Sequence, residues 1–88
     1  MHAVVVNVSI DEPDADLGVL REEVVPRVSQ APGFVTGYWT RRGNTGLSMI
    51  VFDSEDAANA ATERVRSGVP EGIATVEKIE VREVVAHA

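Results

Sequence analysis

Cysteine is absent from this 88-residue chain, which excludes disulfides, thiolate metal ligands and a cysteine nucleophile. Histidine is scarce, because the two histidines, His2 and His87, stand near opposite ends of the sequence. The sequence also lacks a metal-spaced cluster, a Ser-His-Asp arrangement and a glycine-rich phosphate loop. It therefore predicts no metal site and offers no familiar set of catalytic groups.

Basic residues are few and scattered. Eight Lys and Arg against fourteen Asp and Glu give a formal net charge of −6, and Arg41–Arg42 is the only adjacent basic pair. Nucleic acids and anionic membranes attract positively charged proteins, so we expect neither as a partner. The valine-rich run Val4–Ile10 is too short to span a bilayer, and the first residues lack the basic region of a secretory signal. These absences predict a soluble, cytoplasmic protein.

The distinctive residues are concentrated in the middle of the chain. All four aromatic residues and four of the seven glycines lie within residues 31–53, which read APGFVTGYWTRRGNTGLSMIVFD. Two apolar runs, Phe34–Arg42 and Leu47–Asp53, flank the segment Gly43–Gly46, whose composition is typical of a turn. We interpret this stretch as a central β-hairpin.

The remaining elements follow from the spacing of apolar residues. Valine-rich segments near both ends predict strands, and apolar residues recur at helical spacing in two segments between them. Pro26 lies inside the first helical pattern and should kink that helix near Glu22–Glu23, because proline lacks an N–H group. Ser54 can cap the second helix. We expect strands and helices, in chain order, over Ala3–Ile10, 17–31, Phe34–Arg42, Leu47–Asp53, 54–67 and Ala74–Ala86.

This β-α-β-β-α-β order predicts an α+β fold of the ferredoxin-like type, with a single domain over residues 1–88. The two helices would cover one face of a four-stranded antiparallel sheet. Small side chains on the second helix would allow it to approach the sheet closely. The residues that we expect on that side are Ala57, Ala60, Ala61 and Val65.

The uncovered face of such a sheet normally meets water and is polar. Alternation along the strands does not predict a polar face here. Whichever way the strands are set, that face keeps apolar residues: Val5, Trp39 or Tyr38, and Ile50 with Phe52 or Met49 with Val51. Large exposed apolar patches mark interfaces. We therefore expect a homodimer in which two sheets pack face to face and form a closed, barrel-like core.

Two segments of the chain resemble a known family. APGFVTGYW opens the hairpin with Pro32-Gly33-Phe34, and GLSMIVFDSEDAANAA ends the next strand in Phe52-Asp53-Ser54 before an alanine-rich helix. This pattern is similar to the dimeric α/β-barrel superfamily, and within it to the antibiotic-biosynthesis-monooxygenase-like domains. The resemblance implies a homodimer whose subunits hold a small hydrophobic cavity. It also implies oxidation of an aromatic substrate by O₂ without metal, flavin or any other cofactor.

The resemblance also suggests site residues. An Asn, a Trp, a Tyr and an Arg are implicated in the quinone-forming monooxygenases of this family. The candidates here are Asn7, Trp39 and Tyr38 for catalysis, and Arg41, Phe52 and Met49 for binding a hydrophobic or aromatic ligand. Each candidate also has a structural interpretation. The aromatic residues can be packing residues, the asparagine a buried amide satisfied by backbone or water, and the arginine a solvated hairpin end.

The sequence leaves three functions open. The first is cofactor-independent oxidation of a small aromatic substrate. The second is a non-catalytic small-molecule-binding or assembly domain of the same fold, which the lack of an acid–base or metal set favours. The third is haem binding, for which haem-degrading members of the family carry an Asn on the first strand and a Trp on the second helix, followed shortly by a His. Asn7 matches the first of these, but residues 54–67 contain neither Trp nor His.

Overall fold

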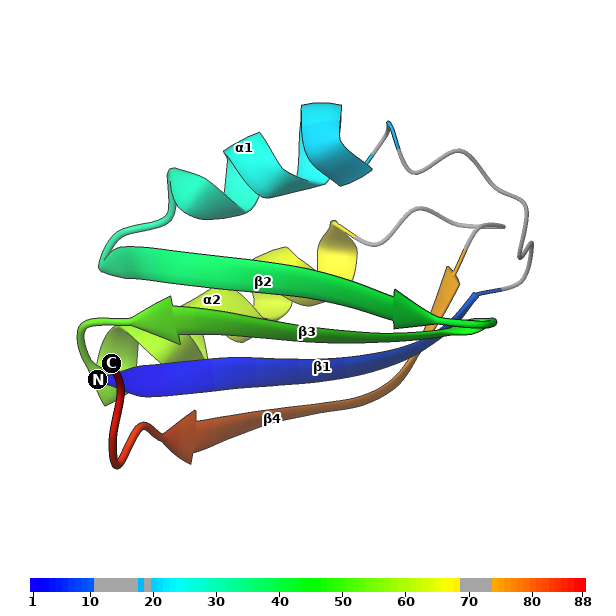
Figure 1. Cartoon of the computed structure of the whole chain (residues 1–88). Coiled ribbons are helices and arrows are strands. Elements are labelled where there is room, and N and C mark those ends of the chain that lie inside the picture. The colour runs from blue at the N-terminus through cyan, green and yellow to red at the C-terminus, as the bar shows by residue number, and fades with distance from the viewer. Residues whose placement is uncertain (11–17, 19, 69–73) are drawn as a thin grey trace.

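The computed structural model describes residues 1–10, 18, 20–68 and 74–88. Within these ranges the elements follow one another in the predicted order (Figure 1). They are β1 (His2–Ile10), the π-helical turn η1 (Leu20–Val24), α1 (Val25–Ser29), β2 (Phe34–Arg42), β3 (Thr45–Phe52), α2 (Glu55–Ser67) and β4 (Ala74–Glu83). None of the helices in the described ranges has the length and apolar character needed to cross a membrane.

The strands form one antiparallel sheet in the order β2-β3-β1-β4. Both helices lie on the same side of this sheet, where α1 contacts β2 and α2 contacts β1, β3 and β4 (Figure 1). The prediction of an α+β fold with a four-stranded antiparallel sheet and two helices is therefore confirmed. The arrangement is compatible with a ferredoxin-like fold.

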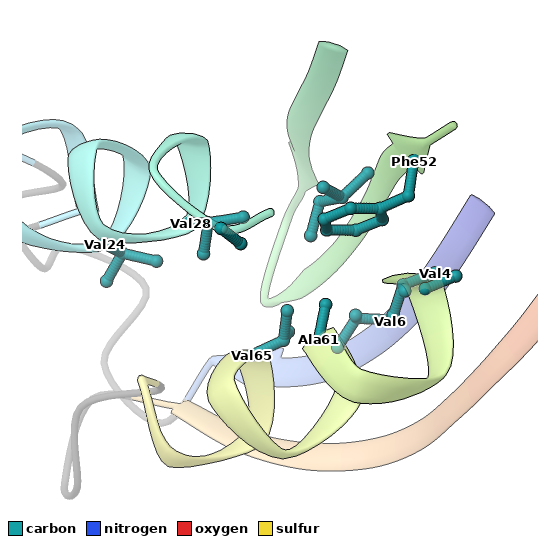
Figure 2. Close-up of a cluster of buried hydrophobic side chains, with 10 residues drawn as sticks. Val4, Val6, Val24, Val28, Phe52, Ala61 and Val65 are labelled. Atoms are coloured by element: carbon teal, nitrogen blue, oxygen red, sulfur yellow. The ribbon is translucent and has the colours of Figure 1, made fainter. Parts of the chain in front are cut away.

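The main core lies between the helices and the sheet, where apolar side chains from both layers meet (Figure 2). Its buried members are Val4, Val6, Val24, Val28, Ala31, Ile50, Phe52, Ala58, Ala61 and Val65. Burial of this apolar surface is the dominant stabilising contribution to such a fold. On α2 the predicted side was partly wrong, because Ala58 is buried and Ala60 is exposed.

β2 departs from strict alternation near its start. The pairing with β3 shifts by one residue between Phe34 and Thr36, so Val35 is an extra residue in the strand. Phe34 consequently packs on the core side together with Trp39. Strict alternation would place Phe34 on the same face as Tyr38, and the bulge moves it to the core side.

β4 has a similar irregularity and is shorter than predicted. Its pairing with β1 shifts by one residue between Asn7 and Val8. The shift brings Val76 onto the core side, where Ile79 and Val81 also lie. Strict alternation from Ile79 would place Val76 on the opposite face. The strand ends at Glu83 rather than at Ala86.

The first helix is irregular where the sequence predicts a kink. A π-helical turn over Leu20–Val24 precedes α1, and Pro26 lies in the first turn of α1, where its missing N–H removes no bond within that α-helix. The helix ends at Ser29, two residues before the predicted end. The predicted start at residue 17 lies outside the described residues.

The hairpin connection is tighter than predicted. Only Gly43 and Asn44 separate β2 from β3, and Gly43 has a φ of 61°. A positive φ at the first loop position is typical of a two-residue hairpin turn with glycine there. The Asn44 carbonyl accepts a hydrogen bond from the Ile10 N–H at 2.7 Å. The hairpin end is thereby tied to the end of β1.

Candidate functional site

Among the residues that the structure describes, no helix lies on one face of the sheet, and we call this face the open face. The strand registers place its side chains in four rows that cross the sheet in the order β2, β3, β1, β4. Row 1 is Thr36-Val51-Ala3-Arg82, row 2 is Tyr38-Met49-Val5-Glu80, row 3 is Thr40-Leu47-Asn7-Lys78 and row 4 is Arg42-Thr45-Ser9-Thr75. The rows differ sharply in exposure and charge.

The two middle rows carry exposed apolar side chains on β2 and β3. Tyr38 is 65% exposed, Leu47 is 46% exposed and Met49 is 45% exposed. We call these three residues the β2–β3 patch. Because neighbouring large apolar side chains are seldom left in water without a role, the patch is a candidate interaction surface.

The open face is closed at row 1 by residues that follow β4. Ala3, Val5 and Val51 are each less than a tenth exposed, and Val84 packs against them. The Val84 N–H donates to the Met1 carbonyl at 3.0 Å. Figure 1 shows the C-terminal segment turning back from β4 and ending beside the N-terminus. The chain thus covers the row 1 end of the open face together with Val5 in row 2, and leaves the β2–β3 patch exposed.

Charged side chains line the open face along β4. Glu80 Oε1 lies 2.9 Å from both Nε and Nη2 of Arg82, and Glu80 Oε2 lies 3.8 Å from Lys78 Nζ. The hydrogen bond from Arg82 holds the pKa of Glu80 below its usual value against a smaller opposing effect of desolvation, and the positive charges of both neighbours add to the lowering. We call these three residues the β4 strip.

The predicted site residues divide between the two faces of the sheet. Three of them, Asn7, Tyr38 and Met49, lie on the open face. The other three alternate onto the helix-covered side, and they are Trp39, Arg41 and Phe52. Since the sheet lies between the two sets, all six cannot contact one small ligand within a single chain.

Two of the three residues on the helix-covered side, Phe52 and Trp39, take part in packing. Phe52 is fully buried, and its ring meets that of Phe34 edge to face with centroids 6.2 Å apart and an interplanar angle of 82°. The indole of Trp39 lies beside Gly37, where an added Cβ would come within 2.9 Å of Cζ3 and Cη2. Trp39 also packs against the main core. Arg41 is exposed near the hairpin end.

On the open face, the half-buried Asn7 pairs with Leu47 of β3 and Lys78 of β4. Tyr38 and Met49 are paired with each other in the adjacent row. The open face therefore groups an amide, a phenol and a thioether around apolar side chains. Such groups can bind and orient a ligand through hydrogen bonds and apolar contact.

The residues that carry the family resemblance meet at one structural joint. Gly33 has a φ of 82°, and an added Cβ would lie 2.6 Å from Asp53 Oδ1 and 2.7 Å from the Ala57 Cβ. The Asp53 N–H donates to the Gly33 carbonyl at 2.8 Å, and the Ser54 hydroxyl accepts the Ala57 N–H at 3.1 Å. These contacts hold the start of β2 against the connection between β3 and α2. The residues at this joint therefore help to specify the fold.

The histidines do not extend the candidate site. His2 Nε2 lies 3.2 Å from Glu55 Oε2, while His2 Nδ1 is buried without a hydrogen-bond partner among the described residues. His87 is exposed in the C-terminal segment. Within the described ranges, no three His, Cys, Asp or Glu side chains are grouped so as to hold a metal ion.

Alternation along the last strand sets Lys78, Glu80 and Arg82 on one face, but the sequence predicted neither a role for this strip nor the cover at Val84. The β4 strip had a readable signal, because charges at every second residue of a strand share one face. The cover at Val84 had no local signal, since it depends on where the chain turns after β4.

Comparison with known proteins supports the fold but no activity. No family model matches the chain, and no curated protein matches it. A solved structure titled "Structural Genomics, protein YJCS" is similar, with a TM-score of 0.60 and 14% sequence identity. The match covers 94% of this chain and 97% of that chain. At this identity the likeness concerns the fold alone.

Proposed function

We propose that this protein is a homodimeric domain of the dimeric α/β-barrel type, in which the open faces of two copies pack against each other. The observation that carries the proposal is the β2–β3 patch, whose three large apolar side chains are left uncovered by their own chain. Covering such a patch is favourable by roughly 25 cal/mol for each Å² of apolar surface removed from water. The resemblance of the hairpin and second-helix segments to dimeric α/β barrels supports the same assembly.

A charge placed in the patch tests this assembly. We expect the wild-type protein at tens of micromolar to have twice the 9.4 kDa mass of one chain by light scattering. Met49→Lys should weaken dimerisation more than about tenfold, because tenfold is only about 1.4 kcal/mol and burying an unpaired charge costs several. Asn59→Lys is the matched control, since Asn59 is exposed on α2. A wild-type protein that is monomeric under these conditions would refute the proposal.

The function that this geometry supports best is that of an assembly or small-molecule-binding domain without catalytic chemistry. The open face offers hydrogen-bonding and apolar groups, and the described residues include no group of side chains suited to holding a metal. A ligand for this face would be small and hydrophobic or aromatic, held between the two sheets. Such a ligand would raise the stability of the dimer, and the gain would grow with the logarithm of its concentration once that exceeds the dissociation constant.

The second candidate is cofactor-independent oxidation of an aromatic substrate. It is favoured by the presence of Asn7, Tyr38 and Met49 on one face, which gives three of the predicted site residues a common surface. Oxygen chemistry of this kind needs a substrate that forms an electron-rich carbanion, and the protein supplies desolvation and a hydrogen bond. O₂ uptake with a panel of phenols tests it. Asn7→Ala should abolish the uptake and Thr36→Ala should not, whereas equal uptake in both variants would exclude this chemistry.

A further inference from the structure

Two open faces whose strands are nearly aligned can pack symmetrically in two ways. The two-fold axis between the sheets runs either along the strands or across them. An axis along the strands sets each row over the same row of the partner and sets β2 over β4 of the partner. An axis across the strands sets each strand over its own copy and reverses the rows. Row 1 then faces row 4, and row 2 faces row 3.

The cover at row 1 favours the axis across the strands. Val84 packs against the buried group of Ala3, Val5 and Val51, so this end of the open face is already covered by its own chain. With the axis along the strands, the two covered ends would meet and crowd the same end of the interface. With the axis across the strands, each covered end faces row 4 of the partner. There the side chains on the three strands β3, β1 and β4 are the small residues Thr45, Ser9 and Thr75.

The β4 strip favours the same axis independently. Lys78 lies in row 3 and Glu80 lies in row 2. When the rows are reversed, Lys78 faces the partner's Glu80 and Glu80 faces the partner's Lys78, which gives two contacts of opposite charge. With the other axis, the strip faces the uncharged Tyr38 and Thr40 in these rows. Complementary charges of this kind fix orientation more than they add affinity.

We infer that the two-fold axis of the dimer crosses the strands between rows 2 and 3, and that Lys78–Glu80 contacts between the two chains set this orientation. The inference rests on the proposed homodimer and specifies how its two copies are arranged. It also sets Met49 of one copy over Leu47 of the other, so the apolar patch covers itself.

Two single charge reversals test the orientation. Lys78→Glu leaves two negative charges at positions 78 and 80, and Glu80→Lys leaves two positive charges there. Each variant alone should dimerise about tenfold more weakly, because like charges face each other across the axis. In a 1:1 mixture, opposite charges face each other again in the heterodimer. With one variant labelled with ¹⁵N, native mass spectrometry should show heterodimers well above the half expected from random exchange.

The matched control uses the exposed pair on α2. Arg66 Nη1 lies 3.9 Å from Glu63 Oε1, and Arg66→Glu and Glu63→Lys change the net charge by the same amounts as the β4 variants. Their mixture should show random exchange. A random heterodimer fraction for the β4 pair in a protein that does dimerise would overturn the orientation and leave the proposed dimer standing. A monomeric wild-type protein would overturn both.

Discussion

Gly37 gives the indole of Trp39 the space it occupies beside β2. An added Cβ would lie 2.9 Å from two indole carbons, so Gly37→Ala must displace the ring or the strand. We expect this substitution to lower the free energy of unfolding by about 1–3 kcal/mol. Trp39 is the only tryptophan, so its emission spectrum and urea unfolding report on this contact. Thr36→Ala on the other face of β2 is the control, and unchanged emission in Gly37→Ala would contradict the packing.

For Glu80 the structure predicts a clear dependence on pH. The hydrogen bond from Arg82 lowers its pKa in the folded protein below the ordinary value of 4.5. A carboxyl with a lowered pKa stabilises the folded state above its unfolded pKa, and this contribution is lost as the pH falls through the folded pKa. The stability gained from Glu80 should therefore be complete near neutral pH and lost in acid below 4.5.

The titration of Glu80 can be followed directly by ¹³C NMR of its side-chain carboxyl. We expect a midpoint below 4.5 in the wild-type protein and a higher midpoint in Arg82→Gln, because the first cause of the lowering is then removed. Arg66→Gln on α2 should leave the midpoint unchanged. Identical midpoints in the wild type and Arg82→Gln would show that the Arg82 contact does not form in solution.

At the scale of elements, Gly33 joins the start of β2 to the β3–α2 connection. Alanine at its φ of 82° costs about 1–2 kcal/mol, and the contact with Asp53 adds to that cost. We expect Gly33→Ala to lower the free energy of unfolding by about 2–4 kcal/mol in urea. Adding Asp53→Ala should restore only part of the loss, since it relieves the contact with Asp53 and leaves both the contact with Ala57 and the backbone cost. Full recovery in the double variant would contradict the argument from φ.

The order of the elements was predictable from the sequence because its signals are local. Turn residues, a capping serine and apolar spacing mark where each element begins and ends, and β2 was predicted with its observed bounds, Phe34–Arg42. The side of the sheet on which each strand residue lies was less predictable. One extra residue at Val35 reverses the face of Phe34, and a shift in β4 does the same for Val76. Alternation carries no signal for such bulges, because they depend on pairing with a neighbouring strand.

At the scale of the whole molecule, the candidate site depends on what covers the open face. The sequence predicted that this face is apolar, and Tyr38 and Met49 lie exposed on it. It did not predict that Val84 covers one end, because that contact joins the two ends of the chain. The grouping of Asn7 with Trp39 came from residue types rather than from position. The sheet places these two residues on opposite faces.

The central claim is that two open faces pack against each other, and isotope-filtered NMR tests it most directly. In a 1:1 mixture of ¹³C-labelled and unlabelled chains, only contacts between copies give filtered NOEs. We predict NOEs from the Met49 methyl group to apolar side chains of rows 2 and 3 in the partner. The absence of filtered NOEs, or filtered NOEs arising only from residues of α1 and α2, would contradict the account.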